Sequence, residues 1–315
     1  MLFNSIDFAI FLPIVFLLYW FVFNRNLKLQ NLFIVVASYV FYGWWDWRFL
    51  VLLAFTSLFS FASGLAIEKY RDTPRKAKTA NILNIVINLL ILGVFKYYNF
   101  FVTSFADAFL GGKTEGLLLK VILPVGISFY TFKALSYSID VFRGKLKPTR
   151  DVIQYCAYVG FFPQLLAGPI ERATNLLPQL EKPRTFDYEM GVDGLRQILW
   201  GLFKKMVIAD NCAVYVDRNF STYQTQSGST LLLAAIFFAF QIYGDFSGYS
   251  DMAIGTGKLF GFKTMKNFNF PYFSRDIAEF WRRWHISLTT WFRDYASWLH
   301  PLSNTGFLRH PDQTR

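Results

Sequence analysis

Long apolar runs are the feature that most constrains this sequence. A helix needs roughly 20 residues to cross the ~30 Å hydrocarbon core of a bilayer, and runs of about that length recur along the chain. Hydrophobic residues make up 54% of the chain and charged residues only 17%, which argues against a soluble protein. The first runs are residues 6–23, 29–45, 49–67, 82–95 (with room to extend toward 109) and 117–139. We therefore expect an all-α polytopic membrane protein.

The basic residues lie mainly in short loops between these runs. If the runs alternate across a membrane, loops 24–28, 68–81 and 140–151 share one side and hold eleven Lys and Arg, against two on the other side. Cytoplasmic loops carry the excess, so we expect the N-terminus outside. The net charge of +11 therefore indicates orientation rather than nucleic-acid binding, for which there is no recognition motif. Asp7 stands where a signal peptide would be basic, so the first run is interpreted as a retained span.

Regular alternation ends after residue 151. Residues 152–170 are apolar but contain Pro163, Gly168 and Pro169, and proline removes a backbone donor and breaks helices. Irregular backbone at membrane depth is tolerated only where protein buries it or where it lines a cavity. We therefore expect re-entrant or interfacial elements through residue 188.

The later chain alternates between polar and apolar stretches. The sequence predicts a helix over 192–208, a polar loop over 210–229, an apolar run over 230–243 and a small-residue segment over 244–262. Glycines with GxxxG spacing allow helices to approach closely. The pairs with this spacing are Gly244/Gly248 and Gly257/Gly261.

Asp245 and Asp251 adjoin the apolar run, where ionisable groups are costly and usually face a partner or a cavity. Two interpretations stay open. The carboxylates cap helices or pair with Lys258, Arg275 or another arginine, or they line a polar tunnel.

Residues 279–294 contain His285 within a run of tryptophans and arginines. Apolar residues from 277 to 295 follow helical spacing, so one continuous helix is expected, begun by Ser274 or Asp276 as a cap. Within that helix Glu279 can pair with Arg283 four residues on.

His285 is the first candidate for proton transfer near neutral pH, and the alternative is a hydrogen-bonded packing residue. Arg282 and Arg283 suit phosphate groups, or they extend from an interfacial helix toward the membrane surface. The chain has no metal-type cluster, and its two cysteines are interpreted as structural thiols.

Five segments carry a resemblance to a known family. They are PVGISFYTFKALSYSIDVFRG (124–144), FFPQLLAGPIERATNLLPQL (161–180), GLFKKMVIAD (201–210), DFSGYSDMAIG (245–255) and NFNFPYFSRDIAEFWRRWHISLTTWFRDY (267–295). The chain resembles the membrane-bound O-acyltransferases, in the bacterial branch that acetylates alginate. The resemblance implies a multi-span helical bundle with re-entrant helices around a central tunnel.

The resemblance also implies a reaction. A cytoplasmic acyl thioester, such as acetyl-CoA or an acyl carrier, gives its acetyl group toward hydroxyls of an exported polysaccharide such as alginate. The implied partners are membrane lipid and either the polysaccharide or a periplasmic acetyltransferase, with no bound cofactor or metal, in the bacterial inner membrane. Only His285, Arg282 and Arg283 carry over from the family, as its RRWH segment on the cytoplasmic side of the tunnel. His285 is then the candidate catalytic residue, and Arg282 and Arg283 are candidates for binding the donor. Asp245 and Asp251 join them as candidate donor-binding or substrate-binding residues because of their place beside the apolar run.

The sequence departs from the family pattern at its end. The family has a second histidine, in a Trp-His-Gly motif, that is generally taken as the catalytic one, and this chain lacks that motif. We therefore expect an incomplete core over residues 1–295, a divergent tail over 296–315, and low or no activity from this chain alone. The alternative is a non-catalytic membrane protein that binds an acyl donor or is a remnant, and a secondary transporter is less favoured.

Overall fold

The computed structural model describes residues 1–109, 118 and 123–296, and every regular element among them is helical. The all-α expectation is therefore confirmed for this part of the chain. The chain divides into unit 1, Met1–Met265, and unit 2, which starts at Lys266 and is described to Ala296. Most of the divergent tail expected after residue 295 lies outside the described residues.

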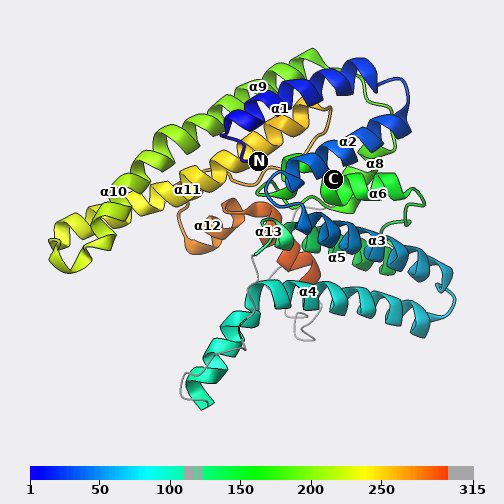
Figure 1. Ribbon diagram of the computed structural model, residues 1–315, viewed down its shortest axis with the longest axis horizontal. Coiled ribbons are helices and arrows are strands. Elements are labelled where there is room, and N and C mark those ends of the chain that lie inside the picture. The colour runs from blue at the N-terminus through cyan, green and yellow to red at the C-terminus, as the bar shows by residue number, and fades with distance from the viewer. Residues whose placement is uncertain (110–117, 119–122, 297–315) are drawn as a thin grey trace. The chain divides into compact units, whose positions relative to one another are not determined.

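The N-terminal helices of unit 1 follow the predicted apolar runs (Figure 1). They are α1 (Ile6–Leu17, continued by a π turn over Leu18–Val22), α2 (Leu27–Gly43), α3 (Arg48–Lys69), α4 (Pro74–Phe109) and α5 (Ile127–Phe142). α3 and α4 are long and apolar enough to cross a membrane, as is the later helix α11 (Gly228–Leu259). The fourth run therefore does extend to Phe109. The helix in the fifth run begins only at Ile127, later than predicted, and the expected turn at 111–116 lies outside the described residues.

Buried polar side chains join α3, α4 and α5. Ser60 Oγ donates to Asn84 Oδ1 at 2.8 Å, and Asn84 Nδ2 donates to Ser138 Oγ at 2.8 Å. Such bonds between helices stabilise association where lipid supplies no hydrophobic driving force. Ser60, Asn84 and Ser138 are therefore accounted for by contacts between these helices.

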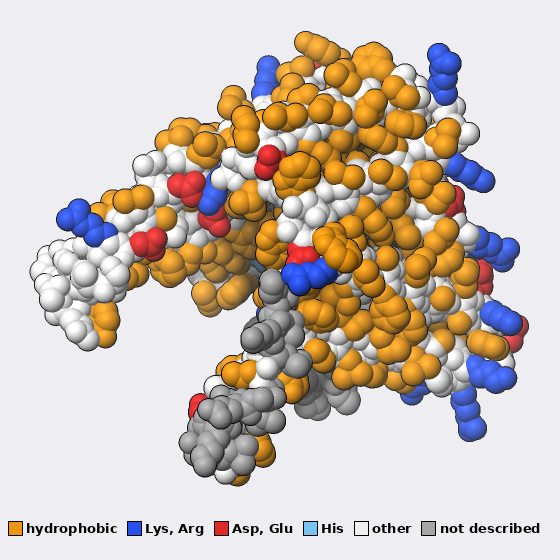
Figure 2. Space-filling model, viewed as in Figure 1, with side chains coloured by type: hydrophobic (Ala, Val, Ile, Leu, Met, Phe, Trp, Pro, Cys, Tyr) orange, Lys and Arg blue, Asp and Glu red, His pale blue; other side chains and the backbone are white. Residues whose placement is uncertain are grey.

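Basic side chains gather at one edge of unit 1 (Figure 2). The α1–α2 and α3–α4 connections, which contain loop 24–28 and the start of loop 68–81, lie at that edge in Figure 1. The arrangement agrees with the expectation that these two loops share a side.

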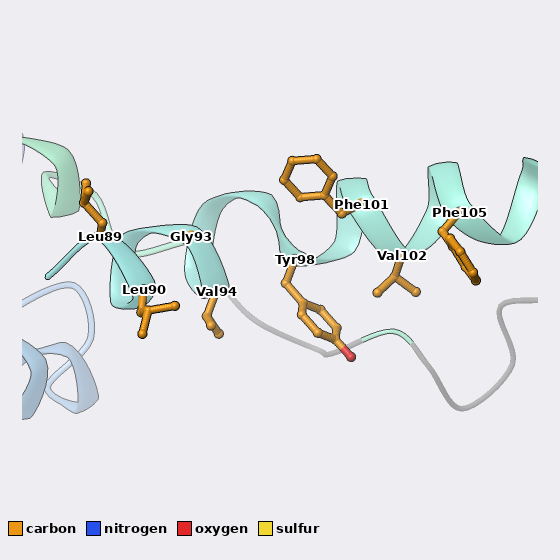
Figure 3. A pocket seen from close by; sticks show the side chains of 8 residues that line it. All are labelled: Leu89, Leu90, Gly93, Val94, Tyr98, Phe101, Val102 and Phe105. Carbon is orange, nitrogen blue, oxygen red and sulfur yellow. The ribbon is translucent and has the colours of Figure 1, made fainter. Parts of the chain in front are cut away.

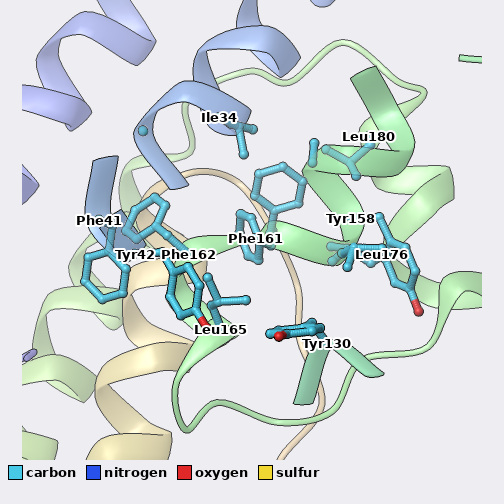
Figure 4. Close-up of a cluster of buried hydrophobic side chains, with 14 of the residues drawn as sticks. Ile34, Phe41, Tyr42, Tyr130, Tyr158, Phe161, Phe162, Leu165, Leu176 and Leu180 are labelled. Atoms are coloured by element: carbon cyan, nitrogen blue, oxygen red, sulfur yellow. The ribbon is translucent and has the colours of Figure 1, made fainter. Parts of the chain in front are cut away.

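The predicted break within residues 152–170 is present. α6 (Val152–Gly160) ends at Phe161, the short α7 (Phe162–Leu165) follows, and α8 (Ala173–Leu180) comes after a buried loop. Ser38 Oγ accepts from the Phe162 backbone N–H at 3.1 Å, which satisfies a donor that the break frees. Figure 4 shows Phe161, Phe162 and Leu165 in the apolar core. The break is thus buried by protein rather than exposed to lipid.

A long antiparallel helix pair completes unit 1. α9 (Tyr188–Leu202) continues through a π segment (Phe203–Ala209) into α10 (Asp210–Ser221), and α11 (Gly228–Leu259) packs along all three. The predicted loop over 210–229 is therefore largely wrong. Its polarity suggested a loop, but Val216 and Asn219 form a buried face on a helix that packs against α11.

Glycines bring α9 and α11 together. A Cβ on Gly201 would lie 2.6 Å from the Gly248 carbonyl oxygen, and a Cβ on Gly255 would lie 2.5 Å from that of Gly194. The predicted close approach is confirmed for Gly244/Gly248, since a Cβ would lie 3.1 Å from the Lys204 carbonyl oxygen at Gly244 and 2.8 Å from the Gly201 carbonyl oxygen at Gly248. It is wrong for Gly257/Gly261, since Gly261 has φ +80° and follows the end of α11.

Unit 2 begins with a 3₁₀ turn at Pro271–Phe273. Next come α12 (Ile277–Arg283), α13 (Ile286–Trp291) and a π segment (Phe292–Ala296). Asp276 caps α12 by accepting from Glu279 N at 2.6 Å, which selects one of the two predicted caps. The continuous helix expected over 277–295 is wrong, because the chain breaks at Trp284 and His285.

Candidate functional site

His285 lies at the break between α12 and α13, in the left-handed backbone conformation with φ 42° and ψ 54°. This conformation is rare for a residue with a side chain and persists only where its surroundings enforce it. Asn267 supplies much of that constraint. Its carbonyl oxygen accepts from Ile286 N at 2.8 Å, and its Oδ1 accepts from Ser287 N and Oγ at 3.2 and 2.9 Å.

A further backbone hydrogen bond lies on the other side of the break, where Asn269 N donates to the Arg283 carbonyl at 2.9 Å. We call this set of hydrogen bonds between residues 267–269 and 283–287 the clasp. Residues 267–269 therefore run beside residues 283–287 and hold the break from both ends. Helical periodicity gives no sign of this contact, because it joins residues about twenty positions apart.

The half-buried His285 imidazole stacks on the Phe268 ring, with centroids 6.3 Å apart and an interplanar angle of 14°. Burial lowers the pKa of His285 to about 4. The imidazole is then neutral at physiological pH, the form that can accept a proton. Both the proton-transfer and the packing interpretations of His285 are compatible with this position.

The arginines of α12 differ in their surroundings. Glu279 is buried and pairs with Arg283 at 2.5 Å and with Arg275 at 3.1 Å. The predicted Glu279–Arg283 pair is thus confirmed. Hydrogen bonds from Arg275 hold the pKa of Glu279 down to about 2. Arg282 is exposed, and no ion pair joins it to another described residue, so its guanidinium can meet an external anion.

Asp245 and Asp251 lie on α11 in unit 1 and pair with lysines of the π segment. Lys205 lies 2.5 Å from Asp245 and 2.8 Å from Asp210. Lys204 donates to Asp251, which also accepts from Gln197 at 2.8 Å. These carboxylates therefore form charge pairs within the helix interface.

The expected partners of these aspartates were wrong. Lys258 pairs with Asp193 at 2.5 Å, and Arg275 pairs with Glu279. Lys204 and Lys205 were missed as site residues, although two adjacent lysines in an otherwise apolar helix were a usable signal.

An open groove along α4 is lined by side chains that offer no chemistry of this kind (Figure 3). It measures about 630 Å³ and is lined almost wholly by apolar side chains, among them Leu90, Val94 and Phe101. Among the described residues no cluster of His, Cys, Asp or Glu is suited to hold a metal ion.

Comparison with known proteins identifies similar sequences. The family model described as the membrane-bound O-acyltransferase family matches residues 41–296. The probable alginate O-acetylase AlgI of Pseudomonas aeruginosa is 43% identical over 297 residues, which cover 94% of this chain and 56% of that protein. The peptidoglycan O-acetyltransferase of Helicobacter pylori is 35% identical over 324 residues, covering 94% and 61%.

A more distant relative matches a shorter region. The teichoic acid D-alanyltransferase of Bacillus subtilis is 31% identical over 179 residues, which cover 56% of this chain and 45% of that protein. This chain thus spans little more than half the length of the Pseudomonas alginate relative.

Proposed function

Because the chain belongs to the membrane-bound O-acyltransferase family, we propose that this protein transfers acetyl groups from a thioester donor toward hydroxyls of an exported polysaccharide. The observation that carries the proposal is the match of residues 41–296 to the family, within which His285 lies at a constrained helix break. The names of the similar proteins favour acetyl as the acyl group and an envelope or exported polysaccharide as the acceptor.

In this proposal the neutral His285 imidazole acts as general base. It takes the proton of the acceptor hydroxyl while that oxygen attacks the carbonyl carbon of the thioester. The new C–O bond forms, the C–S bond breaks, and the thiolate leaves with the proton that the imidazole returns. Burial keeps the His285 imidazole deprotonated before the reaction begins, but the same burial makes it a weaker base than a free imidazole, so the role rests on its position at the helix break.

The remaining candidates are proposed to bind and position the substrates. The exposed Arg282 suits a donor phosphate, and Arg283, held by Glu279, would keep α12 in position. Asp245 and Asp251 would contribute polar lining whose geometry is fixed by Lys205 and Lys204. No bound metal or cofactor is required in this scheme, in which the thioester is a substrate.

We further propose a multi-pass protein of the bacterial inner membrane with its N-terminus outside. The excess of Lys and Arg in loops 24–28, 68–81 and 140–151 supports cytoplasmic loops there. The acyl donor would then approach from the cytoplasm, and the acceptor, either the polysaccharide or a periplasmic acetyltransferase, from the other side.

The test uses a bacterium that exports alginate and lacks its own acetylating membrane protein. Under the proposal, expression of this chain restores O-acetyl esters on the exported polymer, measured by NMR, whereas the expectation of low or no activity from a chain without the Trp-His-Gly histidine predicts no esters. His285→Gln keeps a polar side chain of similar size but cannot serve as the base at neutral pH, so it should abolish the esters.

Failure to restore esters would contradict the proposal. It would favour the alternative, a donor-binding membrane protein without activity of its own, if the purified chain still bound acetyl-CoA. Restoration by His285→Gln would leave acetyl transfer standing but remove His285 as the base.

A further inference from the structure

Gln164 is a buried polar side chain that the fold leaves without a partner. Its exposed fraction is 1%, and neither Oε1 nor Nε2 makes a hydrogen bond to any described residue. An unmade hydrogen bond at a buried amide costs about 1–3 kcal/mol. A buried group kept at such a cost calls for a specific explanation.

The position of Gln164 is tightly constrained. It belongs to α7, which contacts α2, α5, α6 and α11 in the middle of unit 1. A Cβ on Gly168 would lie 2.6 Å from Gln164 Cα and 3.0 Å from its Cγ, so only glycine at 168 leaves room for this stem. On the other side, Gly126 has φ +80°, and a Cβ there would lie 2.2 Å from the Leu165 carbonyl oxygen.

Several buried polar groups on or near the helices that contact α7 find partners within the protein. Phe162 N–H donates to Ser38 Oγ, and the fully buried Lys133 donates to the Tyr158 carbonyl at 3.0 Å. Glu171 accepts from Asn175 Nδ2 at 2.6 Å. The hydroxyls of Tyr130 and Tyr155 also lack a partner, but among the described residues Gln164 is the one buried side-chain amide whose oxygen and nitrogen are both left without one.

We propose that the Gln164 amide binds a ligand in the interior of unit 1. A primary amide offers both a donor and an acceptor, so it complements a ligand that carries an amide group of its own. This inference rests on the proposed function, because the two thioester donors considered there, acetyl-CoA and an acetylated acyl carrier, both carry an amide-bearing pantetheine arm. Gln164 is then a binding residue for that arm.

The test compares Gln164→Met with Gln30→Met in the purified protein. Both glutamines are 1% exposed, and methionine preserves volume while removing the amide. Gln30 Oε1 accepts from Arg184 at 2.9 Å, so Gln30→Met should lower the melting temperature. Gln164→Met should leave it unchanged or raise it, because it removes an unsatisfied polar group.

Binding is measured separately with pantetheine, acetyl-CoA and an acetylated acyl carrier protein, and with adenosine 3′,5′-bisphosphate as a probe that lacks the arm. Wild type should bind probes that carry the arm, and Gln164→Met should bind them about tenfold or more weakly, the loss expected for one hydrogen-bonding group. A difference between acetyl-CoA and the carrier protein would identify the source of the arm.

Three results would overturn the inference. A clear loss of stability in Gln164→Met would mean that the amide serves the fold. Equal binding of pantetheine by wild type and Gln164→Met would remove its role as a ligand group, as would no binding by wild type. If wild type binds pantetheine through Gln164 yet transfers no acetyl group, the proposed function fails and the binding role stands.

Discussion

The glycine contact between α9 and α11 can be tested with a single added methyl group. In Gly201→Ala the new Cβ would lie 2.6 Å from the Gly248 carbonyl oxygen and 2.9 Å from the Met252 backbone nitrogen. Ordinary contact begins near 3.4 Å, so the two helices must separate locally by roughly 0.8 Å. The Met252 Cγ, 2.8 Å away, could rotate aside, but the other two obstructing atoms are backbone and cannot.

The magnitude follows from two opposing terms. Overpacking costs about 1–3 kcal/mol, and alanine returns up to about 1 kcal/mol of helix propensity. The difference ranges from about 0 to 3 kcal/mol, and a central net loss of about 1–2 kcal/mol is expected. The shift is about 2–4 °C per kcal/mol for 150–250 residues and smaller for longer chains, so for these 315 residues the melting temperature should fall by about 2–4 °C.

Gly93→Ala is the matched control, because Gly93 lies within α4 and nothing stands within 4 Å of its added Cβ. It should be neutral or slightly stabilising. The assay is thermal unfolding of detergent-purified protein followed by tryptophan fluorescence. Equal melting temperatures for Gly201→Ala and Gly93→Ala would refute close packing at this glycine.

Polar contacts in the two units give three further predictions. Asn267→Ala leaves the buried Ser287 N–H and hydroxyl without an acceptor and should lower the free energy of unfolding by roughly 1–3 kcal/mol. Asn269→Ala keeps its backbone hydrogen bond and should lower it less in the same thermal melts. Equal losses of stability would contradict a structural role for the Asn267 side chain. The pKa of Glu279 is lowered, so the stability that its ionised form contributes should be lost as pH falls from about 4.5 toward 2. In Glu279→Gln the melting temperature should depend less on pH over this range. An unchanged pH dependence would contradict the Glu279–arginine ion pairs. Asp251→Ala leaves the buried charge of Lys204 without its carboxylate and should lower the free energy of unfolding by roughly 3–5 kcal/mol. Adding Lys204→Met removes that charge and should restore most of the lost stability. A double variant as unstable as Asp251→Ala would contradict the ion pair as the cause.

The sequence predicted what depends on local chemistry. Run length predicted α3 and the extension of α4, because the bilayer sets how many apolar residues a helix needs. Pro163 and Gly168 predicted the break at α7, since proline lacks the backbone donor. The cap of α12 was predicted as Ser274 or Asp276, because a cap depends only on a short polar side chain beside the first backbone N–H groups of the helix.

The errors arose where distant residues decide the outcome. The apolar spacing of residues 277–295 is compatible with one helix, but Asn267 competes for the backbone of residues 286 and 287 and breaks it. The partners of Asp245 and Asp251 depend on the register of α11 against the π segment, which the sequence does not display. The left-handed backbone of His285, the predicted base, therefore could not be predicted from the residues next to it in the sequence.

The two helix breaks share a physical logic that connects fold to function. A continuous helix satisfies its own backbone, whereas a break frees donors and acceptors that other side chains must meet. Ser38 does so for α7 in unit 1, and Asn267 does so beside His285 in unit 2. Meeting those groups fixes the local backbone, and a fixed backbone holds its side chains in one direction. Helix breaks are therefore where a membrane-embedded chain can hold a polar group ready for a substrate, and Gln164 and His285 both occupy such positions.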